Sequence, residues 1–406
     1  MLRRGPRPLL LHLSLAMMRS VASSSVWPSL SAAWPGATGP ANPDAPAALR
    51  ARIAARVAQG GAEAEARFAE AVLREAWTQD RAFLAGIAAY RRHPYTRDVA
   101  DPPVLWGEGG SRLLDYAPTA GRHAPIVLVV PSLINRAYIL DLKPQKSLMR
   151  FLATQGLRPL LLDWGEPGRI ERRFTLTDYV AGRLERAIAA VGAPVILAGY
   201  CMGGLLALAA ALRQPGRLRG LALLATPWDF HAPDATRARA LAALLPALEP
   251  AMTSTGLLGT DLIQMLFACL SPYETPVKYR QFAKLSPASA SAELFVALED
   301  WLNDGVPLAA PVARACLGEW YGENTPARGE WAIAGAPVDP RHLTCPSFTA
   351  IPSRDRIVPP ESALALAAQL PAPLIHRPAA GHVGMAGGRR AETELWRPLA
   401  AWCGSL

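Results

Sequence analysis

The chain contains, near its middle, the stretch Pro194-Val195-Ile196-Leu197-Ala198-Gly199-Tyr200-Cys201-Met202-Gly203-Gly204. Its apolar first half predicts a buried β-strand over residues 194–198, and the alanine-rich residues 203–212 that follow predict a helix. A strand that passes through a tight G-x-C-x-G turn into a helix is the context of a nucleophile elbow. Such a turn projects its central side chain above a sheet, so Cys201 is the candidate nucleophile. A structural turn around a buried cysteine has the same sequence pattern.

Short apolar runs alternate with helical patterns on both sides of this stretch. The runs predict strands over residues 126–130, 159–163, 221–225, 347–351 and 374–376. Such alternation predicts an α/β fold in which a mostly parallel, doubly wound sheet is covered by helices on both faces. Together with the elbow, this pattern is typical of the α/β-hydrolase fold. Residues 227–335 carry helical patterns without a convincing strand, and we expect them to form a helical cap.

The N-terminal part of the chain predicts a separate helical extension over residues 1–100, and the catalytic domain then covers residues 101–406. Residues 9–18 are apolar but too few to span a bilayer, and we expect an interfacial helix there. The Ser- and Pro-rich residues 20–47 predict a linker, and residues 48–92 predict helix.

Composition excludes several classes of function. The formal net charge is +9, but the arginines that supply most of it are scattered, which does not indicate a nucleic-acid-binding surface. The five cysteines are an odd number without C-x-x-C spacing, which argues against a disulfide framework and a zinc site. We therefore expect no metal, no nucleic acid and a reducing, cytoplasmic environment.

Two residues late in the chain are the candidate partners of the nucleophile. In an α/β-hydrolase the nucleophile, the acid and the base follow one another in this order. Asp355 comes directly after the strand predicted over residues 347–351 and is the candidate acid. His382 follows the strand predicted over residues 374–376 and is the candidate base. A local ion pair of Asp355 and a surface position of His382 are the alternative interpretations.

Backbone N–H groups near Cys201 are the candidate donors to an oxyanion. The N–H of Met202 opens the helix after the nucleophile and supplies the first donor. The loop after the strand at residues 126–130, around Leu133, is expected to supply the second.

Several separate motifs in the same order resemble the polyhydroxyalkanoate synthases, especially their short, class-III-like form, over residues 104–404. The matching segments are residues 131–142, 163–165, 177–180, 199–204, 226–231, 355–359 and 381–382. The resemblance implies that Cys201, Asp355 and His382 form a catalytic triad. It also implies polymerisation of an (R)-3-hydroxyacyl-CoA, with the coenzyme A thioester as substrate and no further cofactor.

The same resemblance implies association with a polyester granule surface, and either a homodimer or a partner synthase subunit. The chain departs from many synthases at Tyr200 and Met202, which flank the nucleophile, and at Ser132-Leu133. Two other functions fit the motifs. A cysteine hydrolase or thioesterase shares all of them, and a granule-associated binding protein without catalysis shares the fold.

Overall fold

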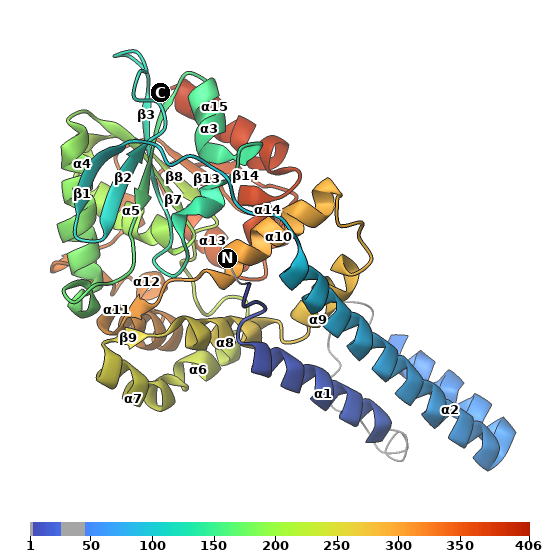
Figure 1. The fold of residues 1–406 in the computed structure, drawn as a ribbon. Coiled ribbons are helices and arrows are strands. Elements are labelled where there is room, and N and C mark those ends of the chain that lie inside the picture. The colour runs from blue at the N-terminus through green and yellow to red at the C-terminus, as the bar shows by residue number, and fades with distance from the viewer. Residues whose placement is uncertain (1–2, 26–44) are drawn as a thin grey trace. The chain divides into compact units, whose positions relative to one another are not determined.

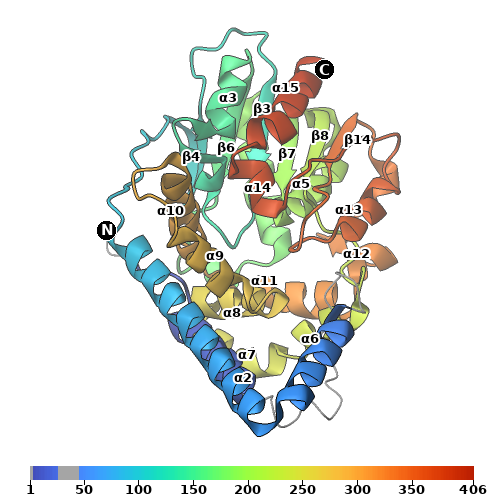
Figure 2. The same cartoon turned by 90° about the vertical axis from the view of Figure 1, so that its right-hand side faces the viewer.

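The structure, a computed structural model, describes residues 3–25 and 45–406. The chain divides into two units, which we describe one at a time. The larger unit comprises Tyr95–Leu270 and Ala297–Leu406, and the smaller unit comprises Met1–Pro94 and Ser271–Val296. Figures 1 and 2 show the elements of both.

Within the described residues, an eight-stranded sheet forms the centre of the larger unit (Figure 1). Its strand order is β1-β2-β6-β3-β7-β8-β13-β14. Strands β6 to β14 in this order run parallel, whereas β1 and β2 are antiparallel to their neighbours. The predicted mostly parallel sheet is therefore confirmed. The strands are β1 (Val104–Glu108), β2 (Ser111–Asp115), β3 (Ile126–Val130), β6 (Arg158–Asp163), β7 (Val195–Tyr200), β8 (Leu218–Leu224), β13 (Ser347–Ala350) and β14 (Leu374–His376).

Helices cover both faces of this sheet, as predicted for a doubly wound fold. The chain moves in one direction along the sheet from β3 to β6 and in the other from β7 to β8. Right-handed crossovers therefore place α3 on one face and α5 on the other (Figure 1). Helix α15 shares the face of α3, since Trp396, at the end of the preceding π-helix (Glu392–Trp396), packs against Phe151 at 5.7 Å between ring centroids. The helices are α3 (Leu148–Thr154), α4 (Glu185–Val191), α5 (Met202–Arg213), α13 (Pro360–Ala367), α14 (His382–Gly387) and α15 (Arg397–Gly404).

The central strands are apolar along their whole length because both faces are covered. In β7 the side chains of Val195, Ile196 and Leu197 have no exposed surface, and in the neighbouring β3 Val127 and Leu128 are equally buried. This continuous burial explains why apolar and polar residues do not alternate along β7, as they would in a half-exposed strand. It also makes β7 a rigid support for the residue that follows it.

The antiparallel edge hairpin was not predicted from the sequence. Strands β1 and β2 pair Glu108 with Ser111 across the turn Gly109-Gly110. A Gly-Gly pair between two short runs is a hairpin signal that would have located these strands. The hairpin carries exposed residues on β1, such as Val104 and Leu105, and this mixed pattern conceals it.

The cap stretch contains helices, but our expectation that it holds no strand was wrong. Two-residue strands pair as β9 (Leu257–Leu258) with β10 (Leu308–Ala309), and as β11 (Ala332–Ile333) with β12 (Ala336–Pro337). Strands of this length leave no hydrophobic periodicity in a sequence. The helices that the cap contributes to the larger unit are α6 (Ala235–Ala242), α7 (Leu245–Thr255), α8 (Thr260–Leu270), α11 (Ala310–Arg314), a π-helix (Ala315–Gly322) and α12 (Thr325–Arg328).

The smaller unit consists of α1 (Leu9–Ser25), α2 (Ala45–Arg92), α9 (Glu274–Phe282) and the first part of α10 (Ala290–Asn303). Tyr279 of α9 packs edge-to-face against Phe83 and Tyr90 of α2, at 6.1 and 5.6 Å between ring centroids. Part of the expected cap therefore packs with the N-terminal helices.

The N-terminal expectations had mixed outcomes. Helix α1 covers the apolar residues 9–18, as expected, but it continues to Ser25. The linker prediction is therefore wrong for residues 20–25, and also for residues 45–47, which begin α2. Residues 26–44 of that predicted linker lie outside the described residues. Helix α2 covers residues 48–92 but is interrupted at Gly61, whose φ of 61° and ψ of −157° are not helical.

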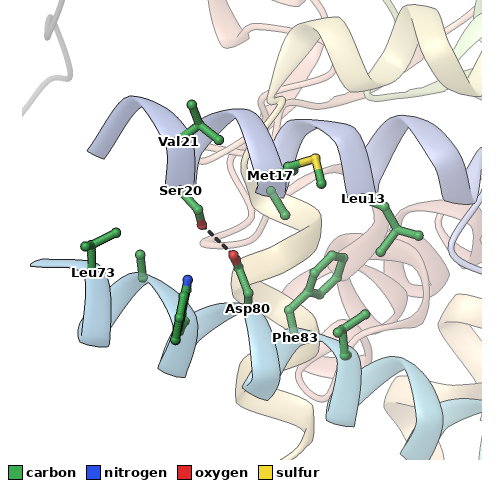
Figure 3. Close-up of a pocket in the computed structure, with 11 residues that line it drawn as sticks. Leu13, Met17, Ser20, Val21, Leu73, Asp80 and Phe83 are labelled. Carbon is green, nitrogen blue, oxygen red and sulfur yellow. Dashed lines mark hydrogen bonds between the residues drawn. The ribbon is translucent and has the colours of Figure 1, made fainter. Parts of the chain in front are cut away.

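A groove of about 400 Å³ runs between α1 and α2 in the smaller unit (Figure 3). Leu13, Met17, Val21 and Leu73 are among the residues that line it, and Ser20 donates a hydrogen bond to Asp80 across it (Figure 3). The surface around the groove is apolar, with Met17 and Trp77 each 68% exposed. Among the described residues, no helix is long and apolar enough to cross a membrane.

We predict that Leu197→Ala lowers the free energy of unfolding by about 2–5 kcal/mol, because it opens a cavity in the most buried strand. Leu374→Ala is the matched control, since Leu374 lies on the same sheet in β14 but is 52% exposed. Its effect should be below about 0.5 kcal/mol. Equilibrium urea denaturation measures both variants, and similar losses would contradict the assigned burial.

Candidate active site

Cys201 occupies a sharp turn between β7 and α5. Its φ of 58° and ψ of −129° are sparsely populated by residues other than glycine. The backbone holds this conformation on both sides of the turn. The N–H of Cys201 donates to Leu224 O at 2.8 Å, and its carbonyl accepts from Gly204 N at 2.9 Å. The predicted elbow is thus present as a strained turn at the carboxyl end of the central strands.

Glycines around Cys201 allow this turn. A Cβ placed on Gly199 would lie 2.3 Å from Gly204 Cα, and one placed on Gly203 would lie 2.1 Å from Val130 O. Both distances are far below van der Waals contact, so neither position accepts a side chain without movement of the backbone. The glycines also bring the first turn of α5 against the end of β3.

Asp355 and His382 form a hydrogen-bonded pair. His382 Nδ1 lies 2.7 Å from Asp355 Oδ2, and both side chains are buried. The other carboxylate oxygen, Oδ1, accepts hydrogen bonds from the N–H groups of Ile357 at 2.8 Å and Val358 at 2.9 Å. The alternative ion pair of Asp355 with a neighbouring arginine is not formed. His382 opens α14 and is not a surface residue.

The loops that carry Asp355 and His382, the candidate acid and base, are joined by their backbones. Ser353 N donates to Pro378 O at 2.9 Å, and Arg354 N donates to Ala380 O at 3.1 Å. The Arg354 guanidinium also donates to Ala379 O. We call residues 352–355 and 378–382 the acid–base unit, because these bonds fix the two loops to each other.

The electrostatics of His382 involve both proposed partners. Burial by itself lowers the pKa of His382, but the negative charges of Cys201 and Asp355 outweigh it and raise the pKa to about 10. Residues from three distant parts of the sequence are therefore neighbours in one site. At neutral pH the raised pKa favours the protonated imidazolium form of His382.

The loop after β3 lies beside the first turn of α5. Ser132 and Leu133 of this loop are buried, and Trp164 Nε1 fixes it by donating to Pro131 O at 3.0 Å. The N–H groups in the first turn of a helix lack intrahelical acceptors. The N–H group of Met202 therefore has no acceptor within α5. The close contact of Gly203 with Val130 thus brings the two predicted oxyanion elements together.

The remaining cysteines lack such a setting. Burial raises the pKa of Cys316 and Cys345, and it raises the pKa of Cys403 to about 12, so these residues stay neutral thiols. Cys269 is exposed. His376 lies in β14, and its Nε2 is 2.5 Å from Glu394 O, which engages it away from the elbow.

Two features of the site were missed from the sequence. Tyr200 donates from its hydroxyl to the backbone carbonyl of His382 at 3.2 Å. The second feature is a polar link between the two ends of the cap stretch, in which Asn324 Nδ2 donates to Asp229 Oδ1 at 2.8 Å and Asn324 Oδ1 accepts from Phe230 N at 2.9 Å. Neither contact leaves a sequence signal, because each joins residues about a hundred or more positions apart.

Comparisons with known proteins agree with the fold and the motifs. The family model described as "Alpha/beta hydrolase family" matches residues 127–393. The family model described as "Poly-beta-hydroxybutyrate polymerase (PhaC) N-terminus" matches residues 99–152. The poly(3-hydroxyalkanoate) polymerase subunit PhaC of Haloferax mediterranei is 30% identical to this chain over 308 residues. This chain belongs to the PhaC family of the α/β-hydrolase superfamily. The resemblance inferred from the motifs is confirmed.

The PhaC relatives match most, but not all, of the chain. The alignment with the Haloferax mediterranei protein covers 74% of this chain and 63% of that protein. The PhaC subunits of Allochromatium vinosum and Synechocystis are 28% and 29% identical, over 68% and 71% of this chain and 79% and 80% of their own lengths. The PhaC family thus accounts for the hydrolase fold of the larger unit.

We predict that His382 keeps its ring proton well above neutral pH, with an apparent pKa of about 10. In Cys201→Ala this pKa should fall, because the burial that lowers it remains while the thiolate charge that raises it is lost. Histidine ring resonances followed by NMR from pH 6 to pH 11 measure the shift. Cys269→Ala is the matched control, and a His382 that titrates near its ordinary value in the unmodified protein would contradict the prediction.

Proposed function

We propose that the protein is an acyltransferase that polymerises (R)-3-hydroxyacyl-CoA into a polyester and releases coenzyme A. The observation that carries this proposal is the elbow cysteine beside a buried His382–Asp355 pair, joined at 2.7 Å, in a chain of the PhaC family. The relatives named poly(3-hydroxyalkanoate) polymerase support the choice of substrate. Cys201 is the proposed nucleophile, His382 the base and Asp355 the residue that orients it.

In the first half-reaction, the Cys201 thiolate attacks the thioester carbonyl of the substrate. The developing oxyanion accepts hydrogen bonds from the N–H groups proposed at Met202 and Leu133. The C–S bond to coenzyme A then breaks, and the departing thiolate takes the proton of the His382 imidazolium. The acyl group is left on Cys201 as a new thioester, so the reaction exchanges one thioester for another.

In the second half-reaction, neutral His382 removes the proton of a 3-hydroxyl group. The hydroxyl oxygen attacks the acyl-Cys201 carbonyl, an oxygen ester forms, and Cys201 leaves as a thiolate. Asp355 stabilises the imidazolium that results, which restores the starting state. General-base assistance of this kind contributes about 10²–10⁴-fold to the rate.

Cysteine suits this sequence of steps better than serine. A thioester on Cys201 keeps the acyl group activated, whereas an ester on a serine would gain little free energy from transfer to another hydroxyl. The proposed first step also needs a cation beside Cys201, and the raised pKa of His382 favours one there.

A hydrolase that passes the acyl group to water is the alternative function. It uses the same residues, and only the acceptor differs. The cap favours transfer to a hydroxyl, because its aromatic residues pack at the site. Phe230 stacks on Trp320 at 5.5 Å and meets Tyr321 at 5.0 Å, and the charge of Cys201 acts on Tyr321. Such a surface shields a thioester from water.

Purified protein incubated with (R)-3-hydroxybutyryl-CoA tests the function. We predict release of free coenzyme A together with ester chains of increasing length, both measured in one reaction. Cys201→Ala should abolish acylation of the protein and lower the rate by at least about 10³-fold, since the covalent step is lost.

Cys269→Ala is the matched control and should retain full activity, because Cys269 is exposed and lies outside the triad. Coenzyme A release with only free hydroxyacid would identify a thioesterase instead. Acyl labelling that persists in Cys201→Ala would contradict the assigned nucleophile. No release and no labelling, with or without a partner subunit, would favour a binding role without catalysis.

The groove between α1 and α2 is the proposed contact with the polyester granule. The product of the proposed reaction is insoluble in water, so an enzyme that remains attached to its chain meets an apolar surface. Met17, Met18, Val21 and Trp77 are 68%, 65%, 59% and 68% exposed along these helices, which is unusual for large apolar side chains. We propose a cytoplasmic protein that docks on the granule through this face.

We predict that the triple substitution Met17→Ser, Val21→Ser, Trp77→Ser weakens binding to poly(3-hydroxybutyrate) particles by about tenfold or more, because it removes apolar area from the contact. Co-sedimentation with the particles measures the fraction of protein bound. Ile170→Ser is the control, since Ile170 is 70% exposed but belongs to the larger unit. Unchanged sedimentation, with a change in molecular mass in solution, would assign the groove to a second copy or to a partner subunit.

A further inference from the structure

We propose that Tyr200 is a positioning residue that holds His382 in register with Cys201. This inference rests on the proposed role of His382 as the base for Cys201. Tyr200 is the last residue of β7 and directly precedes the nucleophile. It therefore moves with the elbow, while its side chain reaches the acid–base unit.

Tyr200 touches His382 in two ways. Its hydroxyl donates to the backbone carbonyl of His382 at 3.2 Å. Its ring lies against the imidazole at 5.1 Å between centroids, with 32° between the planes. Both residues are buried, Tyr200 at 4% and His382 at 7% exposure. One side chain thus fixes the main chain and the ring of the base.

The hydroxyl of Tyr200 stays a donor under all working conditions. Burial raises its pKa well above the ordinary value, and the charges of Cys201 and Asp355 raise it further. The hydroxyl therefore stays protonated, and able to donate to His382 O, at the neutral pH of the test described below. The same interactions place Tyr200 near all three members of the proposed triad.

The base needs such a support because its own segment is intrinsically weak. Helix α14 has six residues, contains Gly384 and Gly387, and is followed by Gly388. Helices this short are marginal by themselves, and glycine lowers their stability further. Asp355 restrains His382 only at Nδ1. A second contact is required to set the direction in which Nε2 points.

The contact also joins two parts of the site that are otherwise built separately. The acid–base unit is held together by bonds between residues 353–354 and 378–380. The elbow is held by its own bonds, from Cys201 N to Leu224 O and from Gly204 N to Cys201 O. The Tyr200 hydroxyl links the elbow to the acid–base unit, and so sets the spacing between thiol and imidazole.

Alkylation of Cys201 by iodoacetamide tests this role without any acyl substrate. Mass spectrometry of the peptide that contains Cys201 separates its rate from that of the other cysteines. We expect Tyr200→Phe, which keeps the ring and removes the hydroxyl, to slow alkylation at pH 7 about fivefold. Because no acyl transfer is measured, failure of the proposed polymerisation does not affect the result.

Two comparisons separate positioning from a merely structural role. Tyr116→Phe removes a hydrogen bond of similar length, 3.0 Å to Asp141, at the amino end of the parallel strands, and should leave the rate unchanged. In a His382→Ala background the carbonyl that accepts from Tyr200 is still present, but the imidazole is gone. There Tyr200→Phe should have no further effect on alkylation.

Three results would overturn the inference. Alkylation of Tyr200→Phe at the unmodified rate would show that the hydroxyl does not position the base. An equal loss in Tyr116→Phe would assign the effect to general stability, which thermal denaturation of each variant would also register. A loss of the same size in the His382→Ala background would show that Tyr200 acts on Cys201 by another route.

Discussion

The backbones of β7, α5 and β3 meet around Cys201 at distances that only glycine permits. A side chain at Gly203 would come within 2.1 Å of Val130 O, and one at Gly199 within 2.3 Å of Gly204 Cα. This contact holds Cys201 at a φ of 58° and seats the first turn of α5 beside the loop after β3. The strained turn at Cys201 and the position of the expected oxyanion donors thus follow from a single steric constraint. The apolar, fully buried strands on either side supply the rigidity that maintains it.

Against this fixed elbow, the acid and the base form a second structure with its own bonds. The carboxylate of Asp355 uses one oxygen for the N–H groups of Ile357 and Val358 and the other for His382. It is therefore oriented before it meets the imidazole. The pKa of His382 is raised by Cys201 from the elbow and by Asp355 from this unit, and together they outweigh burial, which would lower it. The raised pKa of His382 therefore depends on the elbow and the acid–base unit together, and not on either one alone.

The sequence predicted what local pattern and chain order encode. Continuous apolar runs located the parallel strands, and the G-x-C-x-G turn located Cys201 between a strand and a helix. The fixed order of an α/β-hydrolase then led to Asp355 and His382, which the fold brings within 2.7 Å of each other. The hairpin of β1 and β2 was missed because exposed residues interrupt its pattern. The contact of Tyr200 with His382 was missed because it joins two turns 182 residues apart, and its geometry depends on the completed fold.

The choice between a growing polymer and hydrolysis lies outside the triad. Cys201, His382 and Asp355 would activate water and a hydroxyl group by the same proton transfers, so they cannot favour one acceptor. What differs is access, since water is small and abundant while the hydroxyl end of a chain must be held. In the proposed function the cap would govern access: Phe230 packs against Trp320 and Tyr321, and the charge of Cys201 acts on Tyr321. The hydrogen bond from Asn324 to Asp229 joins the segment that follows β8 to the residues just after the π-helix that carries Trp320 and Tyr321. In the proposed reaction, exclusion of water would retain the acyl group on Cys201, and the cap would then set the specificity for the acceptor.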